Sequence, residues 1–385
     1  MIKPKIRFDN NYPEWAVVKV EDIIDYERPD KYIVKSDIYC GFGVPVLTAN
    51  KSFILGFTDE SEGVYEGTSA IIFDDFTCDS KYVDFPFKVK FSAIKILKSK
   101  DDNETSLKFF FECLNSKAYK PKGHQRHWIG IIQKQELAIP CYQEQQKIAT
   151  FFTALDEKIR LSEQKLNLIS KIKKGIAQKL FAQDLRFKNK DGYFFDSWKS
   201  YTVGELVDVI GGGTPSTQNL DYWDGDIYWL TPTEINSKYV NSSNRKITFD
   251  GVKNSSAKLL PKGALLLTTR ATLGACSINN QDNPVCTNQG FQSLVCKDGV
   301  DNEFMYYVVT DSAFQKAMTQ RASGSTFLEI SSKNLKGILI HLPSLEEQRQ
   351  IATLLSSLDK KIDCLKQRVK ALKTQKASFM QQMFV

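Results

Sequence analysis

A gap-free internal repeat constrains the fold of this 385-residue chain more than any other feature. Residues 140–182 align with residues 343–385 at a constant offset, and 14 of the 43 positions are identical. Both copies contain Glu-Gln-x-x-Ile-Ala-Thr followed by Leu-Asp. A segment duplicated in this way predicts that the chain is built from two equivalent halves.

Within each copy, apolar residues recur at alternating steps of four and three, which is the seam of a coiled coil. The seam positions are Ile148, Phe152, Leu155, Ile159, Leu166, Ile169, Ile176 and Leu180 in the first copy, and Ile351, Leu355, Leu358, Ile362, Leu365, Val369, Leu372, Phe379 and Met383 in the second. Lys173 and Lys376 interrupt the seam at the same place, and polar residues in a seam tend to fix register.

Such a segment predicts a helix of roughly 38 residues, about 57 Å long at ~1.5 Å per residue. A lone amphipathic helix gains little stability from propensity, so each copy should pack its seam on a partner. The natural partner is the other copy, and we expect the two helices to run antiparallel.

Weaker similarity precedes each helix, because "RFDNNYPEW" at Arg7 resembles "RFKNKDGYFFDSW" at Arg186. The regions between contain short strand-like runs separated by Gly, Asp and Asn turns, and one probable helix each, near residues 106–117 and 302–320. The predicted fold class is α+β, with two globular domains, two long antiparallel coiled-coil helices and a pseudo-twofold internal repeat. The expected segments are residues 1–142 and 183–343 for the globular domains, and 143–182 and 344–385 for the helices.

The net charge of +7 is concentrated in the repeated segments. Residues 143–182 and 346–385 each carry eight Lys or Arg against four Asp or Glu, whereas residues 1–142 carry 20 against 21 and residues 183–345 carry 16 against 16. This pattern is consistent with solvated helix faces or with electrostatic attraction of nucleic acid.

Several function classes are disfavoured by missing motifs. There is no Gly-Lys phosphate loop, no Asn/Asp-Pro-Pro-Tyr/Phe loop and no Cys-x-x-Cys pair, so we expect no catalytic, cofactor-binding or metal site. The eight scattered cysteines are expected to be reduced core thiols. No apolar run approaches the ~18 residues of a membrane span, and we expect a cytoplasmic protein.

Two unlike globular domains on two like helices suit a target that is itself bipartite. Reading heads on one face of DNA lie about 34 Å apart, or a multiple of this, and a helix pair of the predicted length could hold such a spacing.

The chain resembles the specificity (S) subunits of type I restriction–modification enzymes along nearly its whole length. The resemblance rests on "GGGTPSTQNLDYWDGDIYWLTPTEI" from Gly211, "TNQGFQSLV" from Thr287, "SGSTFLEISSKNLKGILIHLP" from Ser323 and both Glu-Gln-x-x-Ile-Ala helices. The first domain lacks the Gly-Thr-Pro-Ser loop and looks like a different recognition subtype, so contact residues do not transfer to it from the second.

The resemblance implies a non-catalytic DNA-recognition subunit whose two target recognition domains each read one half of a split, asymmetric site. It also implies two methyltransferase (M) subunits docked on the helices, followed by restriction (R) subunits. S-adenosylmethionine, ATP and magnesium would then be bound by these partner subunits. The alternatives are the specificity subunit of a type IIB-like fused nuclease–methyltransferase, a self-contained DNA enzyme, and a coiled-coil scaffold.

Candidate DNA contacts are Arg, Lys, Asn, Gln, Ser, Thr and His residues in loops of the two heads. They are Lys51, Ser52, Lys88, Lys90, Arg126 and His127 in the first head, and Thr214, Ser216, Thr217, Arg270, Thr272, Asn288, Gln289, Arg321, Ser325 and Thr326 in the second. For Asn288 and Gln289, internal hydrogen bonding that shapes a loop is the competing interpretation. Candidate methyltransferase-docking residues are Glu144, Gln145, Glu347 and Gln348.

Overall fold

The computed structural model describes the chain except for residues 1–2, 51, 118, 120–125, 271 and 325–327. The chain forms two compact units, of which unit 1 is Met1–Leu166 with Cys364–Val385 and unit 2 is Asn167–Asp363. Each unit contains one globular part and one end of each long helix. The division into four consecutive segments stays a prediction.

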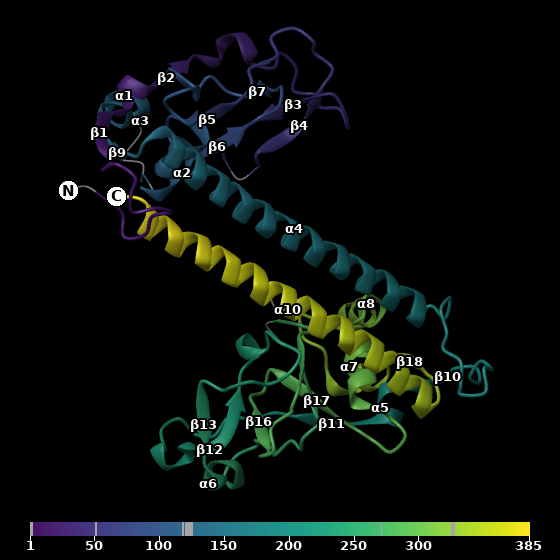
Figure 1. Cartoon of the computed structure of the whole chain (residues 1–385). Helices are drawn as coiled ribbons and strands as arrows, with labels where there is room; N and C mark the ends of the chain where they lie inside the picture. The colour runs from purple at the N-terminus through teal and green to yellow at the C-terminus, as the bar shows by residue number, and fades with distance from the viewer. Residues whose placement is uncertain (1–2, 51, 118, 120–125, 271, 325–327) are drawn as a thin grey trace. The chain divides into compact units, whose positions relative to one another are not determined.

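The globular part of unit 1 alternates short strands with a few helical turns (Figure 1). Its elements are β1 (Ala16–Lys19), α1 (Val20–Ile23), β2 (Ile24–Glu27), η1 (Pro29–Tyr32), β3 (Val44–Leu47), β4 (Ile54–Thr58), β5 (Ala70–Asp74), β6 (Ser80–Val83), β7 (Lys88–Val89), β8 (Ile94–Ser99), α2 (Leu107–Ser116), α3 (His127–Gly130), η2 (Ile132–Lys134) and β9 (Glu136–Ile139).

The globular part of unit 2 has a similar order of elements. They are β10 (Lys199–Thr202), α5 (Val203–Leu206), β11 (Val207–Gly211), η3 (Leu220–Tyr222), β12 (Trp223–Leu230), η4 (Pro232–Glu234), β13 (Arg245–Ile247), α6 (Phe249–Lys253), β14 (Leu265–Thr268), β15 (Cys276–Ile278), β16 (Val285–Thr287), β17 (Phe291–Cys296), α7 (Asn302–Thr310), α8 (Ser312–Arg321), α9 (Ser332–Lys336) and β18 (Leu339–Leu342).

The two globular parts share one sheet topology. Unit 1 has a four-stranded antiparallel sheet in the order β2-β8-β5-β6, and unit 2 has β11-β17-β14-β15. The three-stranded sheets, β4-β3-β7 and β13-β12-β16, each combine one antiparallel and one parallel pair. A two-stranded ribbon, β1-β9 or β10-β18, leads into each long helix. The heads that diverge in sequence therefore have the same fold.

The core of each globular part is its four-stranded sheet packed against one helix. Strands β5 and β14 are continuous apolar runs and are buried on both faces. The packing helices α2 and α7 begin at side-chain caps, since Ser106 accepts from the Phe109 N–H and Asp301 from the Phe304 N–H. Phe110 of α2 and Phe304 of α7 are then buried against these sheets.

The repeated segments form the long helices α4 (Tyr142–Phe181) and α10 (Leu345–Met383). Every predicted seam residue is buried or half-buried. In unit 1, Leu155 and Ile159 near the start of α4 pack with Leu372 near the end of α10. In unit 2, Leu180 at the end of α4 packs with Leu355 near the start of α10. The predicted antiparallel pairing is therefore present within each unit, and the predicted fold class is confirmed.

The two seam lysines make reciprocal ion pairs across the helices. Within unit 2, Lys173 of α4 donates to Asp359 of α10. Within unit 1, the Lys376 Nζ of α10 lies 2.6 Å from the Asp156 Oδ1 of α4. Both lysines are half-buried, and each ammonium group pairs with a carboxylate of the other helix at the point where the apolar seam is interrupted. The prediction that these lysines fix register agrees with this pairing.

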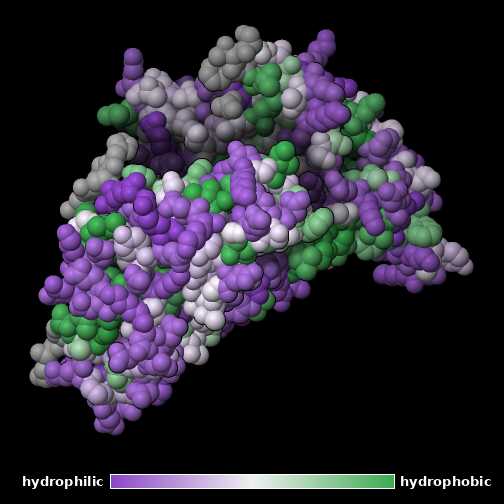
Figure 2. Space-filling model, turned by 90° about the horizontal axis from the view of Figure 1, so that it is seen from above, coloured by the Kyte–Doolittle hydropathy of each residue, from purple (hydrophilic) through white to green (hydrophobic). Residues whose placement is uncertain are grey.

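No helix in the described ranges is long and apolar enough to cross a membrane. On the face seen in Figure 2, hydrophobic side chains form separate patches among hydrophilic ones. All eight cysteines lie in described positions and are free thiols. Cys40 and Cys364 are exposed, so the prediction of core thiols is wrong for these two residues.

Candidate nucleic-acid interface

In unit 2, three loops meet at the buried residue Thr269, which follows β14. The Thr269 N–H donates to the Gly290 carbonyl at 2.8 Å, in the loop between β16 and β17. The Thr269 carbonyl accepts from the Ile330 N–H at 3.3 Å, in the segment before α9. The residues after Thr269, before Gly290 and before Ile330 lie outside the strands, so side chains from distant parts of the sequence come together here.

Polar side chains at this junction are already bonded to one another. Arg270 donates from Nε at 3.0 Å and from Nη2 at 2.6 Å to Glu329 Oε2, and both side chains are exposed. Thr214 Oγ1 donates to Gln289 Oε1 at 2.7 Å. Thr272 Oγ1 donates to the Pro232 carbonyl at 3.5 Å, which adds the loop after β12. We call Arg270, Glu329, Gln289, Thr214 and Thr272 the unit 2 loop cluster.

The glycines before Thr214 are required by close packing. A Cβ on Gly212 would lie 2.0 Å from the Asn288 carbonyl oxygen, and one on Gly213 would lie 2.3 Å from Ser256 Oγ. The Gly213 carbonyl also accepts from Trp229 Nε1 at 2.9 Å. These glycines therefore let the Thr214 loop pack closely against the neighbouring backbone.

The remaining candidates of the second head have different surroundings. Asn288 Oδ1 accepts from the Gly290 N–H at 2.9 Å, which is the loop-shaping role of the competing interpretation. Ser216, Thr217 and Arg321 are exposed, but no bond joins them to the loop cluster. Ser325 and Thr326 lie outside the described residues, as does Lys51 of the first head.

Two candidates in the first head are wrong. Lys88 is 1% exposed, and its Nζ donates to the Glu62 carbonyl at 2.6 Å and lies 3.0 Å from Glu60 Oε2. His127 is 2% exposed, and both its N–H and its ring Nδ1 meet the Asp75 carbonyl. Sequence reasoning failed because it placed both side chains in solvent-facing loops, whereas Lys88 lies in β7 and His127 begins α3.

The other candidates of the first head remain near the surface. Ser52 and Arg126 are exposed. Lys90 is half-buried and donates to Asp37, and this hydrogen bond raises the pKa of Lys90. DNA contact by these three residues stays a prediction.

The four candidate docking residues form an internal clamp at the start of each long helix. Arg7 holds Glu144 through Nε at 3.0 Å and Nη2 at 2.6 Å, and Arg186 holds Glu347 through the same atoms at 3.2 and 2.9 Å. Both glutamates are 0% exposed. The hydrogen bond to Glu144 raises the pKa of Arg7 above its ordinary value. Bidentate pairs of this kind fix geometry as well as charge.

The adjacent glutamines tie the same helix starts to the packing helices of the sheets. Gln145 Oε1 accepts from the N–H of Ser106, the cap of α2, at 2.9 Å. Gln348 Oε1 accepts from the N–H of Asp301, the cap of α7, at 2.8 Å. All four side chains, those of Glu144, Gln145, Glu347 and Gln348, are buried and hydrogen-bonded within their own unit. The prediction that they dock a methyltransferase is therefore wrong, and their role is structural. The repeated Glu-Gln pair joins each helix to its own globular part.

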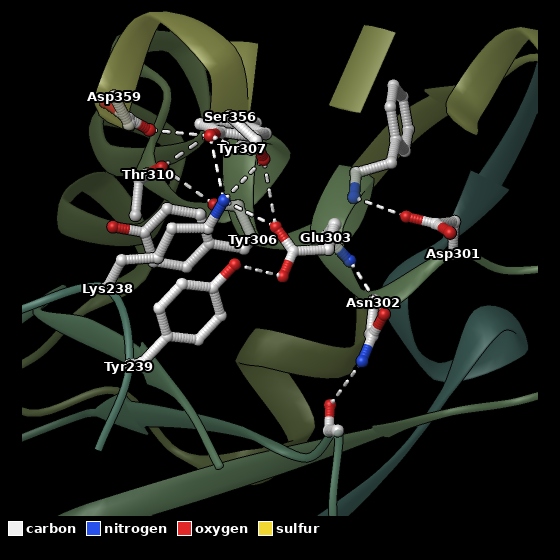
Figure 3. Close-up of polar contacts among 12 residues, drawn as sticks. Lys238, Tyr239, Asp301, Asn302, Glu303, Tyr306, Tyr307, Thr310, Ser356 and Asp359 are labelled. Carbon is white, nitrogen blue, oxygen red and sulfur yellow. Dashed lines mark hydrogen bonds and ion pairs between the residues drawn. The ribbon is translucent and has the colours of Figure 1, made fainter. Parts of the chain in front are cut away.

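A second network in unit 2 connects Lys238 and helix α7 with helix α10 (Figure 3). Lys238, shortly after η4, contacts Glu303 and Tyr307 of α7 and donates to Ser356 of α10. Tyr307 donates at 2.6 Å to Asp359, the residue that pairs with Lys173. Burial and the hydrogen bond to Asp359 both raise the pKa of Tyr307, so this phenol stays protonated and donates. The ring therefore links the globular part to the cross-helix ion pair.

Sequence reasoning missed one residue of the unit 2 loop cluster and the buried residue at which its loops meet. Glu329 was overlooked because acidic side chains were not considered for a DNA surface, although a carboxylate can accept from cytosine N4. Thr269 was overlooked because its backbone, rather than its side chain, organises the loops. Among the described residues there is no group of three or more His, Cys, Asp or Glu that could hold a metal ion.

A family model described as "Type I restriction modification DNA specificity domain" matches residues 12–171 and 196–374. The chain belongs to this family. The two matched stretches correspond to the two halves of the internal repeat, each containing a globular part and most of a long helix.

Relatives with established names are similar over most or half of the chain. The EcoR124I/EcoR124II type I restriction enzyme specificity subunit of Escherichia coli is 32% identical over 364 residues, covering 90% of this chain and 86% of that protein. The MjaIX type I restriction enzyme specificity subunit of Methanocaldococcus jannaschii is 38% identical over 187 residues, covering 48% of this chain and 43% of that protein.

Among solved structures, the fold is similar to the S subunit of a type I restriction–modification system from M. genitalium. The TM-score is 0.68 at 17% identity, and the match covers 100% of this chain and 99% of that one. At this level of identity the likeness establishes the fold.

Proposed function

We propose that this chain is the DNA-specificity subunit of a type I restriction–modification system. Each globular part reads one half of a bipartite, asymmetric DNA site. The long helices carry these two readers and dock the methyltransferase subunits.

The observation that carries this proposal is one fold used twice with unlike loops. The strand order, the strand directions and the clamp at the helix start are the same in both units. The loops at the strand ends carry different residues, including Arg270 in unit 2 and Phe76 at the corresponding place in unit 1. Repeating a scaffold while varying its exposed loops is expected when two unlike half-sites must be read.

The unit 2 loop cluster has the chemistry of a base reader. Arginine is well suited to bidentate contact with guanine O6 and N7 in the major groove. Glu329 orients the guanidinium of Arg270, because Nε and Nη2 both donate to the same carboxylate oxygen. Gln289 adds an exposed amide, which suits adenine N6 and N7.

Helix α4 supports the docking of partner subunits, because its unit 2 portion exposes two large apolar residues. Leu168 and Ile172 are 58% and 44% exposed and are four residues apart, so they share one face of the helix. Exposed apolar stripes of this kind suit a helix from another protein. The proposed occupants are the methyltransferase subunits, with restriction subunits joining the complex afterwards.

We further propose that this chain binds DNA without catalysis, and that S-adenosylmethionine, ATP and magnesium act in the partner subunits. The matched family model and both named relatives are of type I, and no finding supports the type IIB-like alternative. Because residues 1–142 and 183–345 are close to neutral, the chain alone should bind DNA weakly at physiological salt.

The test is to express the full chain with its methyltransferase subunit in a host without adenine methylation, and to sequence the methylated sites. We expect a split motif with one methylated adenine in each half. Arg270→Ala should relax one base position in one half and leave the other half unchanged, with roughly 5- to 150-fold less discrimination at that position. Lys316→Ala is the matched control, because Lys316 is an exposed cation on α8.

Three outcomes would contradict the proposal. They are methylation at a continuous motif, an Arg270→Ala motif changed in both halves, and DNA modification by the pure chain supplied with S-adenosylmethionine, ATP and magnesium.

A further inference from the structure

The common topology shows which loops of unit 1 correspond to the unit 2 loop cluster. Three backbone hydrogen bonds at the strand ends recur between equivalent positions. In the first, Lys90 N–H donates to Leu47 O (3.1 Å) in unit 1 and Asn288 N–H donates to Leu230 O (3.0 Å) in unit 2. In the second, Asp75 N–H donates to Ala93 O (3.1 Å) and Thr269 N–H donates to Gly290 O (2.8 Å). In the third, His127 N–H donates to Asp75 O (3.0 Å) and Ile330 N–H donates to Thr269 O (3.3 Å).

Asp75 is therefore the counterpart of Thr269, and both residues are 1% exposed. Each buried residue joins the same three loops. The loop residues around Asp75 therefore correspond in position to the residues of the unit 2 loop cluster.

Those neighbours have a different chemistry from their counterparts. Phe76 stands where unit 2 has Arg270, and Arg126 stands where unit 2 has Glu329. Between the residues equivalent to Asn288 and Gly290, unit 1 has Phe91 and one further residue where unit 2 has Gln289 alone. Phe76 is 41% exposed and Phe91 is 51% exposed.

The two aromatic side chains are held outward by ordered turns. Asp74 Oδ1 accepts from the Phe76 N–H at 2.9 Å and from the Thr77 N–H at 3.0 Å, which fixes the turn after β5. The Phe91 carbonyl accepts from the Ile94 N–H at 3.4 Å, which closes the turn before β8. Exposed aromatic residues on fixed turns at corresponding loops suit a binding surface better than incidental exposure.

We propose that Phe76, Phe91 and Arg126 form the base-contacting surface of the first head, in which the two rings contact thymine methyl groups in the major groove. Thymine offers the apolar group on the major-groove edge, and aromatic side chains suit it. The exposed Arg126 supplies a cation for the adjacent backbone phosphate. The inference rests on the proposed function and assigns the first half-site a readout unlike that of the second.

The test measures binding of the full chain, in complex with its methyltransferase subunit, to duplexes that carry the methylated motif. Each thymine of both half-sites is replaced in turn by uracil, which lacks the C5 methyl group. Loss of one buried methyl group should weaken binding by the wild-type complex about fourfold at one or two positions. These positions should all lie in the half-site that Arg270→Ala leaves unchanged.

Variants then connect this sensitivity to the protein. Phe76→Ala and Phe91→Ala should each weaken binding, and each should remove the uracil effect at one position. Phe42→Ala is the matched control, because Phe42 is 81% exposed in the same unit but lies in the loop before β3. It should bind both duplexes as the wild-type complex does.

A wild-type complex that reads a bipartite site but is insensitive to uracil would overturn the inference, as would Phe76→Ala and Phe91→Ala variants with wild-type binding. Variants that no longer retain the methyltransferase subunit would instead identify a protein contact and would also overturn it. A wild-type complex without any bipartite specificity is a different result, since it refutes the proposed function itself.

Discussion

Lys376 pairs with a fully buried carboxylate in unit 1, that of Glu112. The Glu112 side chain is 0% exposed, and its oxygens lie 3.3 Å from Lys376 Nζ and 3.2 Å from Lys108 Nζ. Lys376 also pairs with Asp156 at 2.6 Å. Lys376→Met would therefore leave a buried carboxylate with one cation instead of two, and would remove the partner of Asp156 across the helices.

Removing one partner from a buried ion pair costs about 3–5 kcal/mol. The effect should be smaller here because Lys108 remains and because Lys376 and Asp156 are 20% and 35% exposed. We expect Lys376→Met to lower the free energy of unfolding of unit 1 by about 2–3 kcal/mol. Replacing Glu112 by Leu in the same chain should recover part of this loss, since no buried charge then remains unpaired.

Lys373 provides a matched control on the same helix. Its Nζ lies 2.7 Å from Glu163 of α4, but the two side chains are 59% and 41% exposed. Exposed pairs contribute about 0–1 kcal/mol, so Lys373→Met should have little effect although it removes the same charge.

Calorimetry of the purified chain measures both variants. For a unit of this size, the unfolding midpoint should fall by roughly 5–10 °C for Lys376→Met and by less than about 3 °C for Lys373→Met. Since the two units need not unfold together, hydrogen exchange of α2 locates the change in unit 1. Equal shifts for the two lysines, or faster exchange confined to unit 2, would refute the reasoning.

Three further predictions concern acidity, thiol reactivity and loop packing. The Lys98 hydrogen bond lowers the pKa of Glu27 below its ordinary 4.5, so the stabilisation from Glu27 is full above pH 4.5 and is lost as pH falls through the lowered pKa. Glu27→Gln should therefore cost less than about 1 kcal/mol at pH 7, and this cost should shrink as pH falls below 4.5, measured by urea unfolding. Titration of the native chain with a disulfide reagent should give two fast thiols, the exposed Cys40 and Cys364, which a serine double variant would abolish. A Cβ on residue 212 would lie 2.0 Å from the Asn288 carbonyl oxygen, so Gly212→Ala should displace this loop. It should weaken binding at one half-site only, as binding assays with half-site variants of the DNA would show.

The long helices and their seam were predictable, because a heptad pattern over some forty residues predicts both a helix and the residues that it buries. The pattern did not show that α7 and α8 are separate helices. Asp311 has an extended backbone there, and its side chain accepts from the Ala313 N–H, so it ends α7 and caps α8. Such a break depends on a local cap, and the apolar periodicity of residues 302–320 continues across it.

The repeated helix predicted two equivalent halves, but the sequence did not show which strands of the two globular parts correspond. Strands of three to six residues carry little pattern, and β7 is only two residues long. The exposure of the loop candidates was predictable only in part. Arg270 and Gln289 lie just beyond the ends of β14 and β16 and are exposed, as expected from the sequence. Lys88 is buried, because Glu60 and Glu62, distant in sequence, surround its ammonium group.

The repeated polar positions also bear on the direction of the helix pair. In each copy an aspartate precedes the seam lysine by 17 positions, as Asp156 precedes Lys173 and Asp359 precedes Lys376. Parallel, in-register pairing of two copies would place lysine beside lysine and aspartate beside aspartate, and like charges repel. Antiparallel pairing places each lysine beside the aspartate of the other copy, which is the pairing found within each unit. The duplicated polar positions therefore select the direction of the helix pair, a task that the apolar seam alone leaves open.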